Sequence, residues 1–337
     1  MQSLPQEALL AAFGQLAVSR NLIAQVRRGA HCKAGGLWGA SAALLLTTLA
    51  REHKGALLVL TADDVDSMML QNDMSAFGAT SHVLVREEED DDGAVDASTR
   101  SDRQRALQRF ANDGAPLIAS IEAMLQPAAT PRDLRKAKVE LRVGQTLDRS
   151  QILQRAKAAG LRSVPLVLAP GECSVRGDVV DIYPMAADGA LRLEFFDDTL
   201  ESIRSFDPAT QRTTEVHESY ALGLAEEGDA ELGTVVKHLT PSKTLVVTFE
   251  QLRIDERSAR LTSFDSTFGP RKQRLQDTLH PCPQVELSSL PSHEYDYKVL
   301  SAGSAAGSGE SDPAGRLRSV RGIQGQVLLF CRSADEA

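Results

Sequence analysis

The first third of the sequence alternates between two hydrophobic patterns. Segments with apolar residues at helical spacing are separated by short apolar runs that Gly, Pro or Asp bound, and such runs predict buried strands. Helices are expected over 40–53, 65–78, 98–113 and from 130 onward, and strands over 55–62, 81–85 and 115–120. Strands that alternate with helices predict an α/β fold, in which helices cover both faces of a parallel sheet.

The stretch 34–41, AGGLWGAS, is the candidate phosphate-binding loop, because such folds bind phosphate at the turn between a strand and a helix. On the pattern G-x-x-x-x-G-K-[ST], Gly39 fits the second glycine and Ser41 fits the metal-binding hydroxyl. Ala34, however, replaces the first glycine, and Ala40 replaces the lysine that neutralises the β and γ phosphates. We therefore interpret the loop as a degenerate remnant that holds no cofactor.

Other residues of this region have structural interpretations. Asp63 and Asp64 come nearest to a pair of magnesium ligands, but one of them is also expected to cap the helix that follows. Trp38, at the tip of the loop, is interpreted as a packing residue. The run EEEDDD at 87–92 is expected to be a solvated loop, because adjacent like charges repel.

The pattern changes between 139 and 222, where one helix is combined with many strands. Asp148 is expected to cap a helix that ends before Gly160, and consecutive hairpins are expected over 171–207. This composition predicts a smaller α+β domain. We place its boundaries at 139–222, between an α/β lobe over 1–138 and a second α/β lobe over 223–337.

The strand 190–196, ALRLEFF, places an aromatic ring on its polar face. Successive side chains of a strand point to opposite faces, so Arg192, Glu194 and Phe196 share the face that water should contact. Arg176 is expected on the neighbouring strand with its side chain toward solvent, and Val175 toward the core. An arginine beside an exposed aromatic ring is typical of protein interfaces. The alternative is structural: Phe196 packs under a neighbouring loop, and Arg192 pairs with Glu194 or Asp198.

Composition narrows the possible functions. The chain has 337 residues and a net charge of −9, which disfavours a broad surface for nucleic acid. Its four cysteines follow neither a metal-site nor a disulfide spacing, and we expect buried thiols at Cys32, Cys173, Cys282 and Cys331. A leader and an apolar run of membrane-spanning length are not found in the sequence, so we expect a cytoplasmic protein with no membrane partner.

The last part of the sequence adds a strand and a helix over 243–261, a flexible loop over 301–315 and a buried strand over 326–331. Ser333 then has the sequence context of a helix N-cap, only a few residues before the chain ends. Such an ending suggests a fragment of a longer protein.

The segment 171–213, GECSVRGDVVDIYPMAADGALRLEFFDDTLESIRSFDPATQRT, closely resembles the transcription-repair coupling factors and their relative UvrB, in the module with which they bind UvrA. More weakly, 35–64 resembles the degenerate nucleotide loop of the coupling factors, and 325–337 the strand that closes their UvrB-like region. The coupling factors fit better, because UvrB keeps an intact phosphate-binding loop.

This resemblance implies RecA-like lobes with a degenerate P-loop and an inserted UvrA-binding domain. It assigns contacts with UvrA to Arg176, Arg192 and Phe196, with Arg204 as a weaker candidate. The chain would recruit UvrA in transcription-coupled nucleotide excision repair and would not be an enzyme by itself. Full-length members also bind RNA polymerase and duplex DNA and translocate with ATP, through domains whose motifs are not seen in this sequence. The alternative is a UvrB-related nucleotide hydrolase or nucleic-acid remodeller with an unorthodox phosphate loop.

Overall fold

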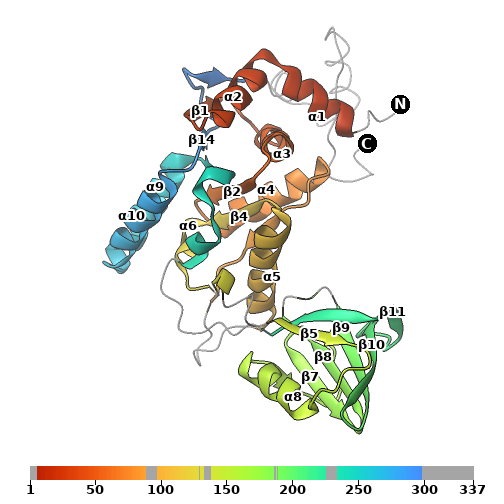
Figure 1. Ribbon diagram of the computed structural model, residues 1–337. Coiled ribbons are helices and arrows are strands. Elements are labelled where there is room, and N and C mark those ends of the chain that lie inside the picture. Colours follow the sequence, from red (N-terminus) through yellow and green to blue (C-terminus); the bar gives the residue numbers. More distant parts are fainter. Residues whose placement is uncertain are drawn as a thin grey trace, which may run out of the picture.

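The computed structural model describes residues 6–88, 97–128, 130–132, 138–185, 187, 189–224 and 234–297. A large body built on one sheet carries a smaller, strand-rich body below it (Figure 1). We call the smaller body, residues 138–224, the middle module.

The large body contains a seven-stranded sheet in the order β15-β1-β14-β13-β2-β4-β3. Every pairing in it is parallel. Its strands are β1 (His31–Gly35), β2 (Ala56–Thr61), β3 (His82–Leu84), β4 (Leu117–Ser120), β13 (Thr244–Phe249), β14 (Gln284–Leu287) and β15 (Tyr295–Asp296). The predicted α/β class is therefore confirmed.

Helices cover both faces of this sheet, because neighbouring apolar residues of each strand point to opposite sides. On one face, Val59 of β2 packs in a core with α1 (Gln6–Gln15), α2 (Ala17–Arg27), α3 (Ser41–Glu52) and α4 (Asp64–Ala76). On the other face, Leu58 and Leu60 pack with α5 (Ala97–Asp113), α6 (Ile121–Leu125), α9 (Gln251–Phe264) and α10 (Phe268–Leu279). Two short 3-10 helices, η1 (Thr234–His238) and η2 (Pro241–Lys243), precede β13.

The order of the strands corrects one prediction: the described residues after 223 do not form a second α/β lobe. β13 and β14 lie between β1 and β2, so the described residues after the middle module complete the first sheet. The physical reason is burial: β13 is buried along nearly its whole length, because neighbouring strands pair with its backbone on both sides and helices cover both of its faces. The middle module is thus an insertion into one α/β body.

The middle module is an α+β unit, as expected. Its six-stranded sheet has the order β11-β10-β9-β8-β7-β6, and β5 (Lys138–Arg142) pairs with β12 (Ser219–Gly223) in a separate two-stranded ribbon. The sheet contains β6 (Arg162–Ser163), β7 (Glu172–Arg176), β8 (Val179–Tyr183), β9 (Ala190–Phe196), β10 (Thr199–Phe206) and β11 (Thr213–His217). The hairpins β7–β8 and β9–β10 are antiparallel, as the sequence predicts.

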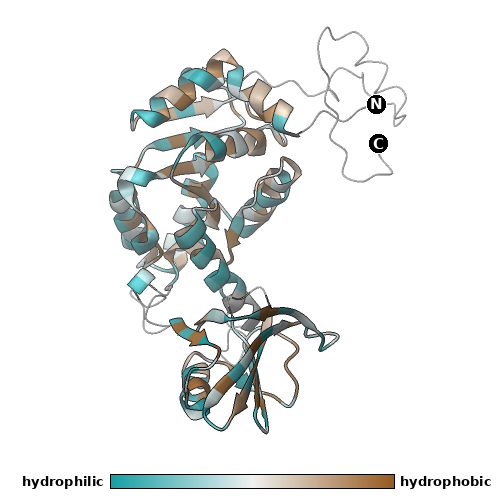
Figure 2. Cartoon of the chain, turned by 45° about the vertical axis from the view of Figure 1, so that its right-hand side comes forward, coloured by the Kyte–Doolittle hydropathy of each residue, from teal (hydrophilic) through white to brown (hydrophobic). Residues whose placement is uncertain are grey.

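One face of this sheet packs on α8 (Arg149–Ala158). Leu191, Leu193 and Phe195 lie in that core with Ile152 of the helix. Brown and teal alternate along the strands of the module in Figure 2, in line with one apolar and one polar face.

Several local predictions are confirmed. The Asp63 carboxylate accepts a hydrogen bond from the Asp66 amide and caps α4, and Asp148 caps α8 through the Ser150 amide. Gly160 follows α8 with a φ of +79°, a conformation that favours glycine.

Some predictions lie outside the described residues: the loop 301–315, the strand 326–331, the Ser333 cap, Cys331, most of the run 87–92 and most of the helix after 130. Glu87, which is described, is partly buried beside Arg103, in contrast to the solvated loop expected for that run.

Burial of Cys32, Cys173 and Cys282 is confirmed, and it raises the pKa of each thiol. Within the described ranges, no single helix has the length and composition of a membrane span. Helices α1 and α2 have them only when taken together, and this pair is bent by 82°.

Candidate partner-binding site

The sheet face of the middle module that points away from α8 is largely polar. Cross-strand pairing places polar residues of four strands side by side, since directly paired residues share a face. We call this the polar face, and its members are Ser174, Arg176, Asp181, Arg192, Glu194, Phe196, Ser202 and Arg204.

Two of the predicted contact residues meet on one buried carboxylate. Asp181 is only 1% exposed, and its Oδ2 accepts a hydrogen bond from Arg176 Nη2 at 2.6 Å. Arg192 donates to both oxygens, from Nε to Oδ1 at 2.7 Å and from Nη2 to Oδ2 at 2.9 Å. These hydrogen bonds raise the pKa of the Arg192 guanidinium. The three side chains together keep one net positive charge.

Arg192 is held by further contacts. Its Nη2 donates to Gln211 Oε1 at 3.0 Å, and its guanidinium lies 4.6 Å from the centre of the Phe206 ring. Gln211 is fixed in turn, since its amide donates to the carbonyls of Val167 and Pro208. The Arg192 side chain is only 19% exposed, so it supports this surface more than it projects from it.

Arg204 belongs to a second cluster on the same face. Its Nη2 donates to Glu194 Oε2 at 2.9 Å, and Ser202 Oγ donates to the same oxygen at 2.8 Å. The alternative pairing of Arg192 with Glu194 is therefore wrong, because Glu194 binds Arg204 and Asp181 takes Arg192.

Phe196 has no comparable support and is 67% exposed, as the sequence predicts. It ends β9, where the tight turn to β10 begins with Asp197 at a φ of +52°. Arg176, at 49% exposure of its side chain, ends β7 near the other hairpin turn at Gly177. The polar face thus presents an aromatic ring and a half-exposed guanidinium at one end of the sheet.

Two details differ from expectation. β8 lies between β7 and β9, so the strand of Arg176 is not the direct neighbour of β9. Val175 is on the core side by its pairing with Val180, yet it is 46% exposed, because it lies at the end of the sheet.

The glycine-rich loop follows β1 and precedes α3, where a phosphate-binding loop would lie. Its Gly36 amide donates to the Leu290 carbonyl at 2.9 Å, and its Leu37 amide donates to Ser288 at 3.2 Å. A Cβ on Gly35 would lie 2.2 Å from the Leu290 carbonyl oxygen. The segment after β14 therefore packs closely against the loop and uses two of the amides that could bind a phosphate.

The other side chains considered for a nucleotide site also form contacts within the protein. Ser41 Oγ donates to the Trp38 carbonyl at 2.7 Å. Trp38 itself is 54% exposed, so the expected packing role is corrected; it lies at the outer tip of the loop. Arg253 of α9 binds Asp63 at 3.3 Å and Asp66 at 2.8 Å, and burial raises the pKa of Asp66. In the part of the chain that is described, no group of three His, Cys, Asp or Glu could hold a metal.

The middle module matches a known protein family. Residues 139–227 match the UvrB interaction domain family. All residues of the polar face lie inside this match, which confirms the resemblance expected from the sequence.

Relatives extend the similarity to the flanking sequence. The chain is 30% identical to the transcription-repair-coupling factor of Myxococcus xanthus over 218 residues, which are 61% of this chain and 18% of that protein. It is 28% identical to that of Bacillus subtilis over 197 residues, 57% of this chain and 17% of that protein. The UvrABC system protein B of Chlorobaculum tepidum is 39% identical over 92 residues, 27% of this chain and 14% of that protein. The chain thus spans less than a fifth of the length of these relatives.

Sequence reasoning missed Asp181, the residue that organises the polar face. A signal was present: Val180 and Ile182 point into the core, so Asp181 must share a face with Arg176 and Arg192. Gln211 carried no comparable signal, because its role depends on the path of the loop between β10 and β11.

Proposed function

We propose that the middle module docks onto UvrA through its polar face, and that the chain serves nucleotide excision repair as a recruiting module. The observation that carries the proposal is the exposed Phe196 beside the Arg176–Asp181–Arg192 cluster, within the part of the chain that matches the UvrB interaction domain.

The chemistry of the polar face suits a partner surface that offers carboxylates around an apolar pocket. Phe196 supplies a large apolar contact, and aromatic and arginine residues are enriched among interface hot spots. Arg176 uses Nη2 for Asp181, and a guanidinium has further N–H donors for a partner carboxylate. Because Asp181 already holds the arginine, little side-chain entropy is lost on binding.

The chain, on this proposal, is not a nucleotide hydrolase by itself. The amides of Gly36 and Leu37 and the Asp63–Arg253–Asp66 cluster are engaged inside the protein, which supports a degenerate loop. Binding of RNA polymerase and duplex DNA, ATP-driven translocation and a cytoplasmic location would belong to a longer protein related to the coupling factors.

Titration calorimetry of UvrA into the full chain tests the proposal. We expect the double variant Arg176→Ala/Phe196→Ala to bind at least about 30-fold more weakly, which corresponds to ~2 kcal/mol at a hot spot. The matched control is Arg274→Ala/Phe264→Ala on α10 and α9, which removes the same residue types from exposed positions outside the middle module. Equal affinity of the wild-type chain and the folded Arg176→Ala/Phe196→Ala variant would overturn the proposal. So would micromolar ATP binding with turnover that Ser41→Ala abolishes.

A further inference from the structure

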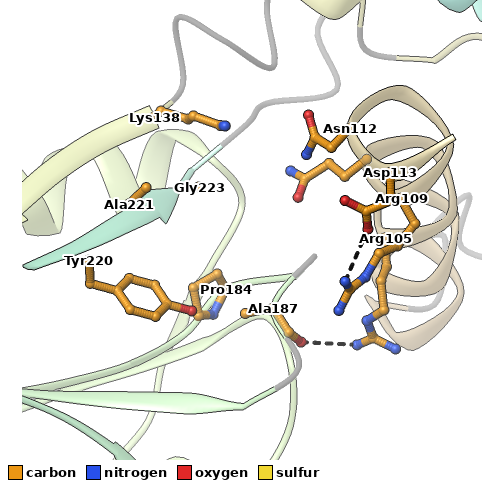
Figure 3. A pocket seen from close by; sticks show the side chains of 11 residues that line it. Arg105, Arg109, Asn112, Asp113, Lys138, Pro184, Ala187, Tyr220, Ala221 and Gly223 are labelled. Carbon is orange, nitrogen blue, oxygen red and sulfur yellow. Dashed lines mark hydrogen bonds and ion pairs between the residues drawn. The ribbon is translucent and has the colours of Figure 1, made fainter. Parts of the chain in front are cut away.

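A cavity of about 230 Å³ lies between the large body and the middle module, outside the polar face. Helix α5 forms one wall, and the β5–β12 ribbon with the turn after β8 forms the other (Figure 3). The walls approach closely: a Cβ on Gly223 of β12 would lie 3.6 Å from Gln108 Nε2 of α5. Arg105 Nη2 joins them with a hydrogen bond of 3.3 Å to the Ala187 carbonyl.

The described lining residues carry three cationic side chains and one carboxylate, although the whole chain carries a net charge of −9. Arg105 and Arg109 come from α5 and Lys138 from β5, whereas Asp113 is the one acid among the lining residues that the structure describes. Asp113 binds Arg109 at 3.1 Å, and Asp102, outside the cavity lining, binds Arg105 at 3.0 Å. Among the described residues, none forms an ion pair with Lys138. In Figure 3 its ammonium group points across the gap toward Asn112.

Neutral hydrogen-bond donors complete the lining. The amides of Gln108 and Asn112 come from α5, and the hydroxyl of Tyr220 comes from the ribbon. Donors of both kinds therefore surround the cavity from two walls. Arginine, lysine, amide and hydroxyl groups are the side chains that bind phosphate oxygens in proteins, and a tetrahedral phosphate can accept from several directions at once.

We propose that this cavity is a binding site for a phosphate group, carried either by a small phosphate compound or by a nucleic-acid backbone. Its size suits one or two phosphate groups, being smaller than a typical drug-sized pocket. A phosphate bound there contacts α5 and the ribbon together, and so adds a link between the large body and the middle module. The site does not depend on UvrA binding, because it shares no residue with the polar face.

Two probes separate the sources of the phosphate. Pyrophosphate is titrated into the full chain by calorimetry, and a short fluorescein-labelled single-stranded oligonucleotide is followed by fluorescence anisotropy. Arg109→Gln/Lys138→Gln removes two cations but keeps Arg105, which joins the walls. We expect this variant to bind about tenfold more weakly or worse, with affinity that falls as salt rises. Arg155→Gln/Arg274→Gln, changed at exposed positions of α8 and α10, is the matched control and should bind like the wild type.

Each outcome decides the proposal. Binding of pyrophosphate alone assigns the site to small phosphates, whereas oligonucleotide binding that pyrophosphate displaces assigns it to a backbone. The proposal is overturned if neither probe binds at millimolar concentration, or if the cavity variant and the control lose affinity equally.

Discussion

Asp181 and Arg192 lie directly opposite each other on β8 and β9, joined by two hydrogen bonds of 2.7 and 2.9 Å. The carboxylate is buried and the guanidinium nearly so, which makes this pair a structural element of the middle module. On the proposed function, Arg192 would serve both UvrA binding and the folding of the module. Experiments on the polar face must separate the two roles.

The first prediction compares the two arginines. Arg192→Ala leaves Asp181 with only Arg176, and we expect a loss of about 1–3 kcal/mol in the free energy of unfolding, as for a buried charge that loses hydrogen bonds. Arg176→Ala should cost less than about 1 kcal/mol, because that side chain is half-exposed and the Arg192 pair remains. Urea unfolding followed by circular dichroism measures both. Equal stability of the two variants would contradict the structural role of Arg192.

The second prediction concerns Phe196. Phe196→Ala should weaken UvrA binding by about 2 kcal/mol and change the stability by no more than about 0.5 kcal/mol, because the ring is mostly in solvent. Calorimetry and thermal unfolding of the same samples give both values. Phe264→Ala, at a ring that is 87% exposed on α9, is the control and should leave UvrA binding unchanged. A large loss of stability in Phe196→Ala would show that the ring packs within the module.

The third prediction concerns the opposite face of the same strand. Leu193 is fully buried in the core with α8, so Leu193→Ala should cost about 2–5 kcal/mol through the cavity it leaves. UvrA affinity measured at a temperature where the variant is folded should stay close to the wild-type value. Denaturant unfolding reports the first effect, and a loss below about 1 kcal/mol would place Leu193 outside the core.

The fourth prediction concerns the glycine-rich loop. Ala40→Lys restores the missing lysine, yet the Gly36 and Leu37 amides still donate to Leu290 and Ser288. We expect no ATPase activity in a coupled assay and unchanged UvrA binding. A vigorous ATPase activity in this variant would show that the nucleotide site was nearly intact.

The fifth prediction concerns pH. Burial raises the pKa of Tyr297 from 10.0 to about 12, where its hydroxyl accepts a hydrogen bond from Ser19 and its ring stacks on Phe13. Above pH 10 the phenol ionises in the unfolded chain before it does so in the folded one, so the stability that Tyr297 contributes falls between pH 10 and about 12 and is fully present below pH 10. Tyr297→Phe should lose less stability across that range, as thermal unfolding at pH 8 to 11 would measure. If the melting temperatures of the wild type and Tyr297→Phe fell equally with pH, the raised pKa of Tyr297 would be contradicted.

The sequence predicts local elements well, because their signals are local. The apolar runs of β2, β4 and β13, the caps of α4 and α8 and the hairpins of the middle module follow from spacing and turn residues. The position of β13 and β14 between β1 and β2 does not, since strand order depends on pairing between distant segments, such as Ala56 with Thr244 and His31 with Gln284. The expected second lobe was wrong for this reason.

The candidate site was predictable in part. Strand parity places Arg192 and Phe196 on one face, but it does not tell a projecting arginine from one held by a buried acid. That distinction needs the register of β8 against β9 and the path of the loop that carries Gln211. The cavity beside α5 is equally hidden from the sequence, because its walls come from separate parts of the chain.

The strand order also dictates the sequence of events during synthesis. When β1 and β2 leave the ribosome, the two strands that fill the space between them have not been made, because β13 and β14 follow the whole middle module. The hairpins of the module, in contrast, pair with immediate neighbours and can form at once. The nascent chain therefore holds an incomplete sheet, with β1 separated from β2, until β14 and then β15 have emerged. During translation, all strands of the middle module are therefore synthesised before the sheet into which the module is inserted is complete.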